Sequence, residues 1–284
     1  MLLLTIVLVP LSLFIGIAAS AIGFTAWPLI VPILFIICGF DLYLTICSSL
    51  LVDCGNALVM TLIALKHRQL DISRGLLLSV FALIWITAGI ALGTTFIPKN
   101  EDFFRGSAGF AAILIGIFFI AMGLKKNNRK AFNPGNHEMP SDASVPMAGK
   151  IRIRSLLIYP GVALMAFQVG LVGIGGGMGY AVFLMLCLSF PVLKATGTAM
   201  LMTFCSTLFA ACGIYFQIPD GSLLLSKAYP LIALIVLMSM AGTFVGAKIT
   251  YSLTERKINF LIGGIVILAG LIATAQKYLL RVIS

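Results

Sequence analysis

The chain has 284 residues, of which 61% are hydrophobic and 10% are charged, whereas a soluble domain has about 25% charged residues. This composition excludes a water-soluble globular enzyme. A net charge of +10 would suggest nucleic acid as the partner of a soluble protein. Here most basic residues lie in short segments between apolar runs, where they set membrane orientation, so no nucleic acid partner is expected.

Eight long apolar runs account for most of the chain. A helix needs about 20 residues to cross the hydrocarbon core of a bilayer, which is about 30 Å thick. The runs cover residues 2–38, 42–65, 75–97, 106–124, 155–189, 192–218, 222–250 and 258–280. We therefore predict an all-α polytopic membrane protein in the cell inner membrane. The first run lacks the basic start of a signal peptide, so we expect it to be retained as a helix.

A polar segment at residues 125–154 divides the chain into two apolar halves. It contains seven Lys and Arg residues and few large apolar ones, a composition typical of a flexible loop on the cytoplasmic side. We therefore expect a first transmembrane repeat over residues 1–124, a cytoplasmic linker over 125–154 and a second transmembrane repeat over 155–284.

The two halves resemble each other at nearly constant offsets of 148 to 154 residues. GIAASAIG, which begins at Gly16, aligns with GLVGIGGG, which begins at Gly170. Further along, aligned pairs are Ser48 with Thr198, Asp53 with Thr203, Asn56 with Ser206, Gly89 with Gly242, and Gly93 with Gly246. Ordered matches of this kind indicate that each half repeats one structural unit. The two G-x-x-x-G pairs are typical of close helix packing.

The first run of each half is too long for one helix. Residues 2–38 would form a helix of about 55 Å, nearly twice the thickness of the hydrocarbon core. We expect a break in each, marked by Gly16, Gly23, Pro28, Pro32, Gly170, Gly173 and Gly175 to Gly177. A broken first helix pair plus three spans per half gives 8 to 10 membrane segments. Five elements per half make the second half an inverted copy of the first, a plan typical of transporters.

The segment GIGGGMG, residues 173–179, is the strongest candidate for a binding site. Its glycines predict exposed backbone N–H groups before a half-helix that runs from about Met178 to Leu188, and such a helix start attracts anions. Alternatively, the glycines only permit close packing. In the first half, Thr25 is placed to cap a second half-helix and Pro28 lies near its first turn. Inverted repeats would aim both helix starts at one cavity.

Asp53 is the one acidic residue deep within a run, where an aspartate costs about 2.5 to 3.5 kcal/mol. Ser49 and Asn56 share its helix face. Asp53 is either a neutral structural group bonded to a neighbouring helix or a coupling residue for a proton or a cation. We favour the proton, because a neutral carboxyl group would not repel an anion.

Other polar groups allow a structural and a functional interpretation. Hydroxyl groups can donate to sulfonate oxygens, but small polar residues also join transmembrane helices; those on the run aligned with Asp53 are Thr196, Thr198, Thr203 and Ser206. The six cysteines lie inside or at the ends of apolar runs, so we interpret them as apolar side chains and not as disulfides or metal ligands. No cofactor is predicted.

The stretch GLVGIGGGMGYAVFLMLCLSFPVLKATGTAM, from Gly170 to Met200, resembles the TauE/SafE sulfite exporter family, also called the toluene sulfonate uptake permeases. The chain length and the two halves joined by a polar loop fit the same family, although AIGF at residues 21–24 replaces the glycine cluster in the first half. The resemblance implies transport of small sulfur-containing anions, such as sulfite, sulfoacetate and other sulfonates.

We therefore predict a secondary transporter of such an anion, with protons as the coupling ion. The alternative is a passive anion channel with a broken-helix filter; an intramembrane enzyme is disfavoured because the runs contain no nucleophile and base pair. Proton coupling is assigned to Asp53 and Asn56. Substrate binding is assigned to Gly23, Phe24, Thr25, Ser48, Gly175, Gly176, Gly177, Met178, Thr198 and Thr203.

Overall fold

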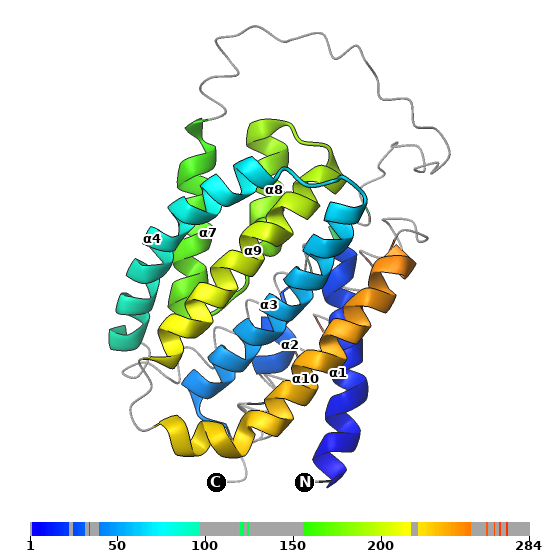
Figure 1. Ribbon diagram of the computed structural model, residues 1–284, viewed down its shortest axis with the longest axis vertical. Coiled ribbons are helices and arrows are strands. Elements are labelled where there is room, and N and C mark those ends of the chain that lie inside the picture. The colour runs from blue at the N-terminus through cyan, green and yellow to red at the C-terminus, as the bar shows by residue number, and fades with distance from the viewer. Residues whose placement is uncertain are drawn as a thin grey trace, which may run out of the picture.

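Figure 1 shows a computed structural model of the chain, and its described part is helical with no strand. The structure describes residues 2–22, 25–31, 34, 40–96, 117, 120–121, 124, 156–216, 221–250, 260, 264, 267 and 271. Its helices are α1 (Leu2–Ile22), α2 (Trp27–Val31), α3 (Leu42–Lys66), α4 (Ile72–Phe96), α7 (Ile158–Val172), α8 (Gly177–Leu188), α9 (Val192–Tyr215) and α10 (Gly221–Thr250). The expected linker and most of the expected last span of each half lie outside the described residues.

Four of the described helices, α3, α4, α9 and α10, are long and apolar enough to cross a membrane. On α4, Leu77, Val80 and Ile84 are each more than half exposed, and apolar side chains exposed in such a patch favour a lipid environment. In contrast, α3 and α9 are mostly buried by the other helices. The structure therefore agrees with the prediction of an all-α membrane protein.

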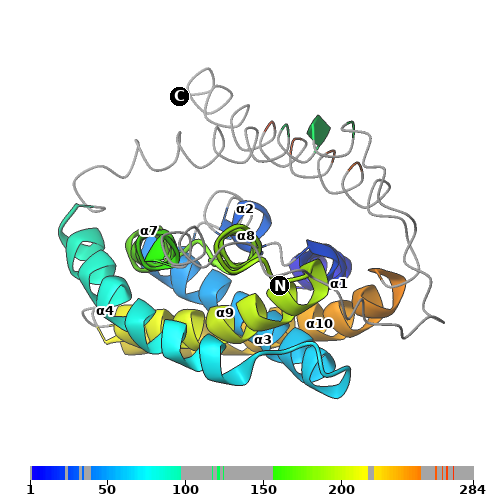
Figure 2. The ribbon, with the colours of Figure 1, turned by 90° about the horizontal axis from the view of Figure 1, so that it is seen from above.

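The helices form two layers (Figure 2). One layer contains α3, α4, α9 and α10, and the other contains α1, α7 and α8 with the short α2 beside them. Between and within the layers, α3 packs on α9, α1 packs on α10, and α7 packs on α4. In Figure 1, α3 and α10 run upward from their N-termini, whereas α4 and α9 run downward.

Both expected breaks are present, in the layer that contains α1, α2, α7 and α8. Helix α1 ends at Ile22 before α2 begins at Trp27, and α7 ends at Val172 before α8 begins at Gly177. Gly173 ends α7 in the left-handed conformation, with φ of 75°, which glycine adopts at little cost. The half-helix predicted from about Met178 to Leu188 is confirmed as α8, which begins one residue earlier.

Two of the glycines expected to break the first runs are instead inside helices. Gly16 lies within α1 and Gly170 lies within α7. A Cβ at Gly16 would overlap the backbone of Ser239 in α10, and one at Gly170 would overlap the backbone of Ile86 in α4. Their physical role is close helix contact, and the helices end further along the chain. Gly23 and Pro32 lie outside the described residues.

The two G-x-x-x-G pairs also lie where helices cross at backbone distance. A Cβ at Gly89 of α4 would overlap the carbonyl of Phe167 in α7, and one at Gly242 of α10 would overlap the carbonyl of Leu13 in α1. The second glycine of each pair contacts the same partner helix one turn later. The expected packing role of these pairs is confirmed.

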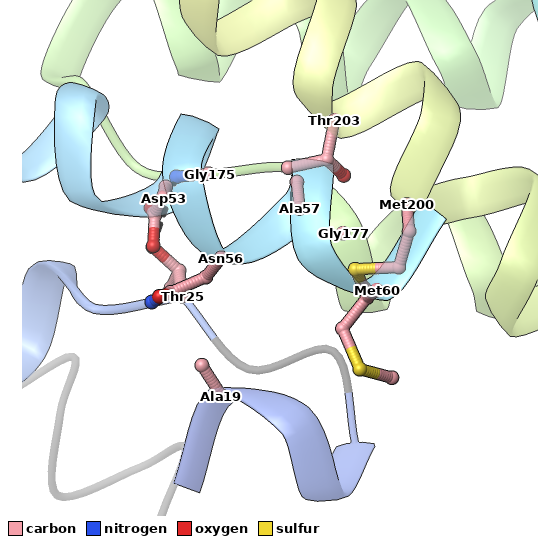
Figure 3. Close-up of a pocket in the computed structure, with 10 residues that line it drawn as sticks. All are labelled: Ala19, Thr25, Asp53, Asn56, Ala57, Met60, Gly175, Gly177, Met200 and Thr203. Atoms are coloured by element: carbon pink, nitrogen blue, oxygen red, sulfur yellow. Dashed lines mark hydrogen bonds between the residues drawn. The ribbon is translucent and has the colours of Figure 1, made fainter. Parts of the chain in front are cut away.

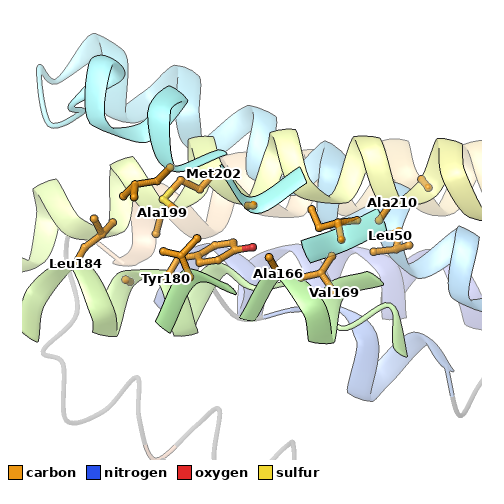
Figure 4. Packing of buried hydrophobic residues seen from close by; sticks show 14 of the residues in the cluster. Leu50, Ala166, Val169, Tyr180, Leu184, Ala199, Met202 and Ala210 are labelled. Atoms are coloured by element: carbon orange, nitrogen blue, oxygen red, sulfur yellow. The ribbon is translucent and has the colours of Figure 1, made fainter. Parts of the chain in front are cut away.

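The largest buried cluster lies where α8 and α9 meet α3, α4 and α7 (Figure 4). Tyr180 of α8 is fully buried in it, and its hydroxyl lies 3.2 Å from the Oγ of Ser206 in α9. A buried phenol requires such a polar partner. This contact fixes α8, the half-helix that follows the glycine segment, against α9.

Candidate functional site

A small cavity lies where α3 meets the two breaks (Figure 3). Its volume is about 10 Å³, which holds about one water molecule. None of its lining residues is Lys or Arg. The lining consists of Ala19, Thr25, Asp53, Asn56, Ala57, Met60, Gly175, Gly177, Met200 and Thr203.

Asp53 in the middle of α3 is held by the break of the first half. The side chain is 4% exposed, and a buried carboxyl group requires hydrogen-bond donors. The backbone N–H of Ala26 donates to its Oδ1 over 2.6 Å, and the hydroxyl of Thr25 donates to its Oδ2. Both carboxyl oxygens therefore accept hydrogen bonds from residues between α1 and α2.

Thr25 connects this carboxyl group to the break of the second half. Its Oγ1 accepts the backbone N–H of Gly175 over 3.1 Å and the backbone N–H of Trp27 over 3.3 Å. The second of these bonds caps the start of α2, as the sequence predicted for Thr25. A continuous chain of hydrogen bonds thus runs from Asp53 through Thr25 to Gly175.

Asn56 lies one turn after Asp53 on the same side of α3. Its Oδ1 accepts hydrogen bonds from Ser239 and Thr243 of α10, each over 2.9 Å. Its Nδ2 is buried and has no hydrogen-bond partner within the described part of the chain. An amide whose oxygen is fixed in this way presents a donor group beside the cavity.

A family model described as sulfite exporter TauE/SafE matches residues 5–272. The chain belongs to this family. The match includes both halves and both breaks, and it confirms the resemblance seen in the sequence. Members of the TauE/SafE family are membrane transporters of sulfite and related anions and are not enzymes. No curated protein and no solved structure matches the chain.

The cavity of this TauE/SafE protein contains six of the residues assigned from sequence. Two of them carry the proposed coupling chemistry and four carry the proposed substrate contacts. They are Asp53, Asn56, Thr25, Gly175, Gly177 and Thr203. The structure therefore places the two breaks and the polar face of α3 around a single point.

Four other assigned residues do not line this cavity. Ser48 donates to the carbonyl of Leu44 within α3. Thr198 of α9 accepts the backbone N–H of Asp71, which lies between α3 and α4. Gly176 and Met178 lie beside the lining glycines without being part of the lining. Gly23 and Phe24 lie outside the described residues.

The sequence reasoning missed the apolar part of the lining. Four residues contribute it: Ala19 of α1, Ala57 and Met60 of α3, and Met200 of α9. Met60 carries a detectable signal, because it lies seven residues after Asp53 and therefore on the same helix face. Ala19 and Met200 resemble the many other apolar residues of their helices, so nothing in their local sequence distinguishes them.

Proposed function

We propose that this chain is a secondary transporter that moves a small sulfur-containing anion, such as sulfite, sulfoacetate or another sulfonate, across the inner membrane together with protons. The observation that carries the proposal is Asp53, a buried carboxyl group that lines the cavity, accepts hydrogen bonds from the first break and is connected to the second break through Thr25. Acidic groups within membrane helices are typical of proton pathways in transporters.

We further propose that the two halves, residues 1–124 and 155–284, are inverted repeats joined by a cytoplasmic linker. The packing supports this proposal, because exchanging the halves maps most of the helix contacts onto one another. Helix α1 contacts α10 as α7 contacts α4, α10 contacts α3 as α4 contacts α9, and α2 contacts α3 as α8 contacts α9. The opposite directions of α3 and α9, and of α4 and α10, also fit this plan (Figure 1). Movement of one repeat against the other would give alternating access.

Neutral donors recognise the anion in this proposal. The Nδ2 of Asn56 lacks a partner within the described residues, and Gly175 and Gly177 line the cavity at the start of α8. The N-terminus of a helix carries about half a positive charge, so an anion can be desolvated there without Lys or Arg. A cavity of about 10 Å³ is too small for a sulfur oxyanion, so the anion enters after the break segments move.

Transport by purified protein in proteoliposomes tests the proposal. Sulfite, sulfoacetate, taurine, thiosulfate and sulfate form the substrate panel. We expect saturable uptake of at least one of these anions, with counterflow when the same anion is loaded inside. Rapid flux that neither saturates nor shows counterflow would instead support the anion channel.

Substitution of Gly175 tests the location of the site. A Cβ at this position would overlap the Oδ2 of Asp53, so Gly175→Ala should weaken anion binding. Gly264→Ala is the matched control, because a Cβ at Gly264 meets nothing within 4 Å. Unchanged affinity in folded Gly175→Ala protein would remove the glycine segment from the site.

A further inference from the structure

The hydroxyl of Thr25 uses all of its hydrogen-bonding capacity. A hydroxyl group has one proton to donate and two lone pairs that accept. The proton of Thr25 goes to the Oδ2 of Asp53. The lone pairs accept the N–H groups of Gly175 and Trp27. Thr25 can therefore form no additional hydrogen bond without giving up one of these three.

Asp53 acts only as an acceptor in this arrangement. Its Oδ1 faces the N–H of Ala26 and its Oδ2 faces the hydroxyl of Thr25, a pattern that fits an ionised carboxylate. The N–H of Gly175 beside α8 donates to Thr25 and also lies close enough to this carboxylate to act as a donor to it. The internal carboxylate thus occupies donors that an external anion would require.

Protonation of Asp53 changes these bonds when the new proton lies on Oδ2 and points toward Thr25. In that position Oδ2 becomes a donor toward Thr25, whose two lone pairs already accept N–H groups. Thr25 must then turn its own proton away and release one of its two N–H partners. Gly175 lines the cavity and Trp27 does not. A bound anion can replace Thr25 as the partner of Gly175, whereas release of Trp27 would leave a buried donor unpaired, which is costly.

Asp53 is the one acidic residue within helices α1, α2, α3, α8, α9 and α10. Charged residues of α1, α2, α3, α8, α9 and α10 other than Asp53 are Lys66, Lys194, Lys227 and Lys248. Lys66, Lys194 and Lys248 lie within three residues of a helix end, and Lys227 lies seven residues into α10. The titratable neighbours are thiols, Cys54 beside Asp53 and Cys205 and Cys212 on α9 near Cys54. α10 faces this part of α3 with the hydroxyls of Ser239 and Thr243.

We infer that Thr25 is a hydrogen-bond switch: protonation of Asp53 makes Thr25 release the N–H of Gly175, which then binds an oxygen of the substrate anion. This inference rests on the proposed function. It assigns Thr25 a positioning role that joins the proton site to the anion site. Binding of one anion should accompany uptake of one proton, and the two should bind cooperatively.

The pH dependence of sulfoacetate binding tests the switch. The charge of sulfoacetate is constant from about pH 6 to about pH 9, so a change in affinity reports on the protein. We expect wild-type affinity to fall about tenfold for each pH unit above the titration of Asp53. Thr25→Val removes the hydroxyl acceptor of the Gly175 N–H at every pH and leaves only the Asp53 carboxylate beside it, so it should bind sulfoacetate up to about fivefold more tightly than wild type at the upper end of this pH range. The total change in the affinity of Thr25→Val across this pH range should be smaller than that of wild type.

Two control variants isolate the hydroxyl of Thr25. Thr25→Ser keeps the hydroxyl and should reproduce the wild-type curve. Thr61→Val removes a buried hydroxyl of α3 that donates to Ala57 within its own helix, and it should also leave the curve unchanged. If Thr25→Val does not fold, Thr25→Ala provides the same comparison. A separate measurement uses wild-type protein in weak buffer, where about one proton should be taken up for each anion bound.

Three results would overturn the inference. A Thr25→Val curve of wild-type amplitude, displaced only along the pH axis, would mean that Thr25 merely solvates the carboxylate. A Thr25→Ser curve like that of Thr25→Val would assign the effect to side-chain shape. Wild-type binding without proton uptake would remove the switch but leave an anion transporter. Failure of the wild type to bind any anion of the panel would overturn the proposed function itself.

Discussion

Trp27 of α2 donates its indole N–H to the carbonyl of Val172, the last residue of α7, over 3.0 Å. The last carbonyls of a helix have no partner within the helix. Here a side chain from the break of the first half satisfies a carbonyl at the break of the second half. With the bond between Gly175 and Thr25, this contact holds the two breaks together beside Asp53.

Replacement of Trp27 by Phe should destabilise the protein. The substitution keeps an aromatic ring but removes the donor, leaving the carbonyl of Val172 without this partner, at a cost of about 1 to 2 kcal/mol. Thermal unfolding of purified protein measures the effect. The other tryptophan of the chain, Trp85 on α4, is 41% exposed and provides the control. Equal melting temperatures for Trp27→Phe and Trp85→Phe would contradict the structural role of the indole bond.

Replacement of Gly242 by Ala should disrupt the contact between α10 and α1. The added Cβ would overlap the carbonyl of Leu13, so the helices must separate, and overpacking of this kind costs about 1 to 3 kcal/mol. Gly264→Ala should be neutral, because its Cβ meets no atom within 4 Å. A melting temperature unchanged by Gly242→Ala would show that the two helices are not in backbone contact.

The sequence predicted the elements of this fold better than the orientation of its side chains. GIGGGMG at residues 173–179 predicted α8, because consecutive glycines end one helix and expose the start of another. The contact of Thr25 with Asp53 joins residues 28 positions apart, and no local pattern indicates it. Angular position around the helix axis explains why Ser48 does not line the cavity as predicted. Ser48 precedes Asp53 by five residues, about 140° around the helix, and faces away from the cavity. Thr198 has the same relation to Thr203.

Replacement of Asp71 by Asn should weaken one end of the helix bundle in a pH-dependent way. Partial burial raises the pKa of Asp71, but the backbone N–H of Arg74, the hydrogen bond and charge of Lys194 and the charge of Arg74 outweigh it, so the pKa lies below its ordinary value. Its carboxylate lies 3.3 Å from the Nζ of Lys194.

A lowered pKa stabilises the folded protein above the ordinary pKa of about 4, and this contribution is lost as the pH falls through the folded value. The melting temperature of Asp71→Asn should therefore be below that of wild type at neutral pH and approach it at about pH 3. The effect should be below about 1 kcal/mol, since the pair is partly exposed. Asp41→Asn, which retains an effective N-cap for α3, is the control. A difference that does not change with pH would exclude the ion pair as its cause.

A cysteine introduced at Ser141 should react with impermeant thiol reagents from the cytoplasmic side only. Ser141 lies in the expected linker, outside the described residues, and the seven basic residues of that segment predict a cytoplasmic location. The experiment requires a background without the native cysteines. Labelling from the outside of intact cells would reverse the proposed topology.

Accumulation of sulfoacetate driven by a pH gradient tests the coupling role of Asp53 most directly. With the membrane potential held at zero, wild-type proteoliposomes should accumulate sulfoacetate about tenfold per pH unit if one proton accompanies each anion. Asp53→Asn resembles the protonated acid, so it should still exchange internal for external sulfoacetate but should not respond to the gradient. Accumulation by Asp53→Asn equal to that of wild type would contradict the account and leave Asp53 a structural polar residue.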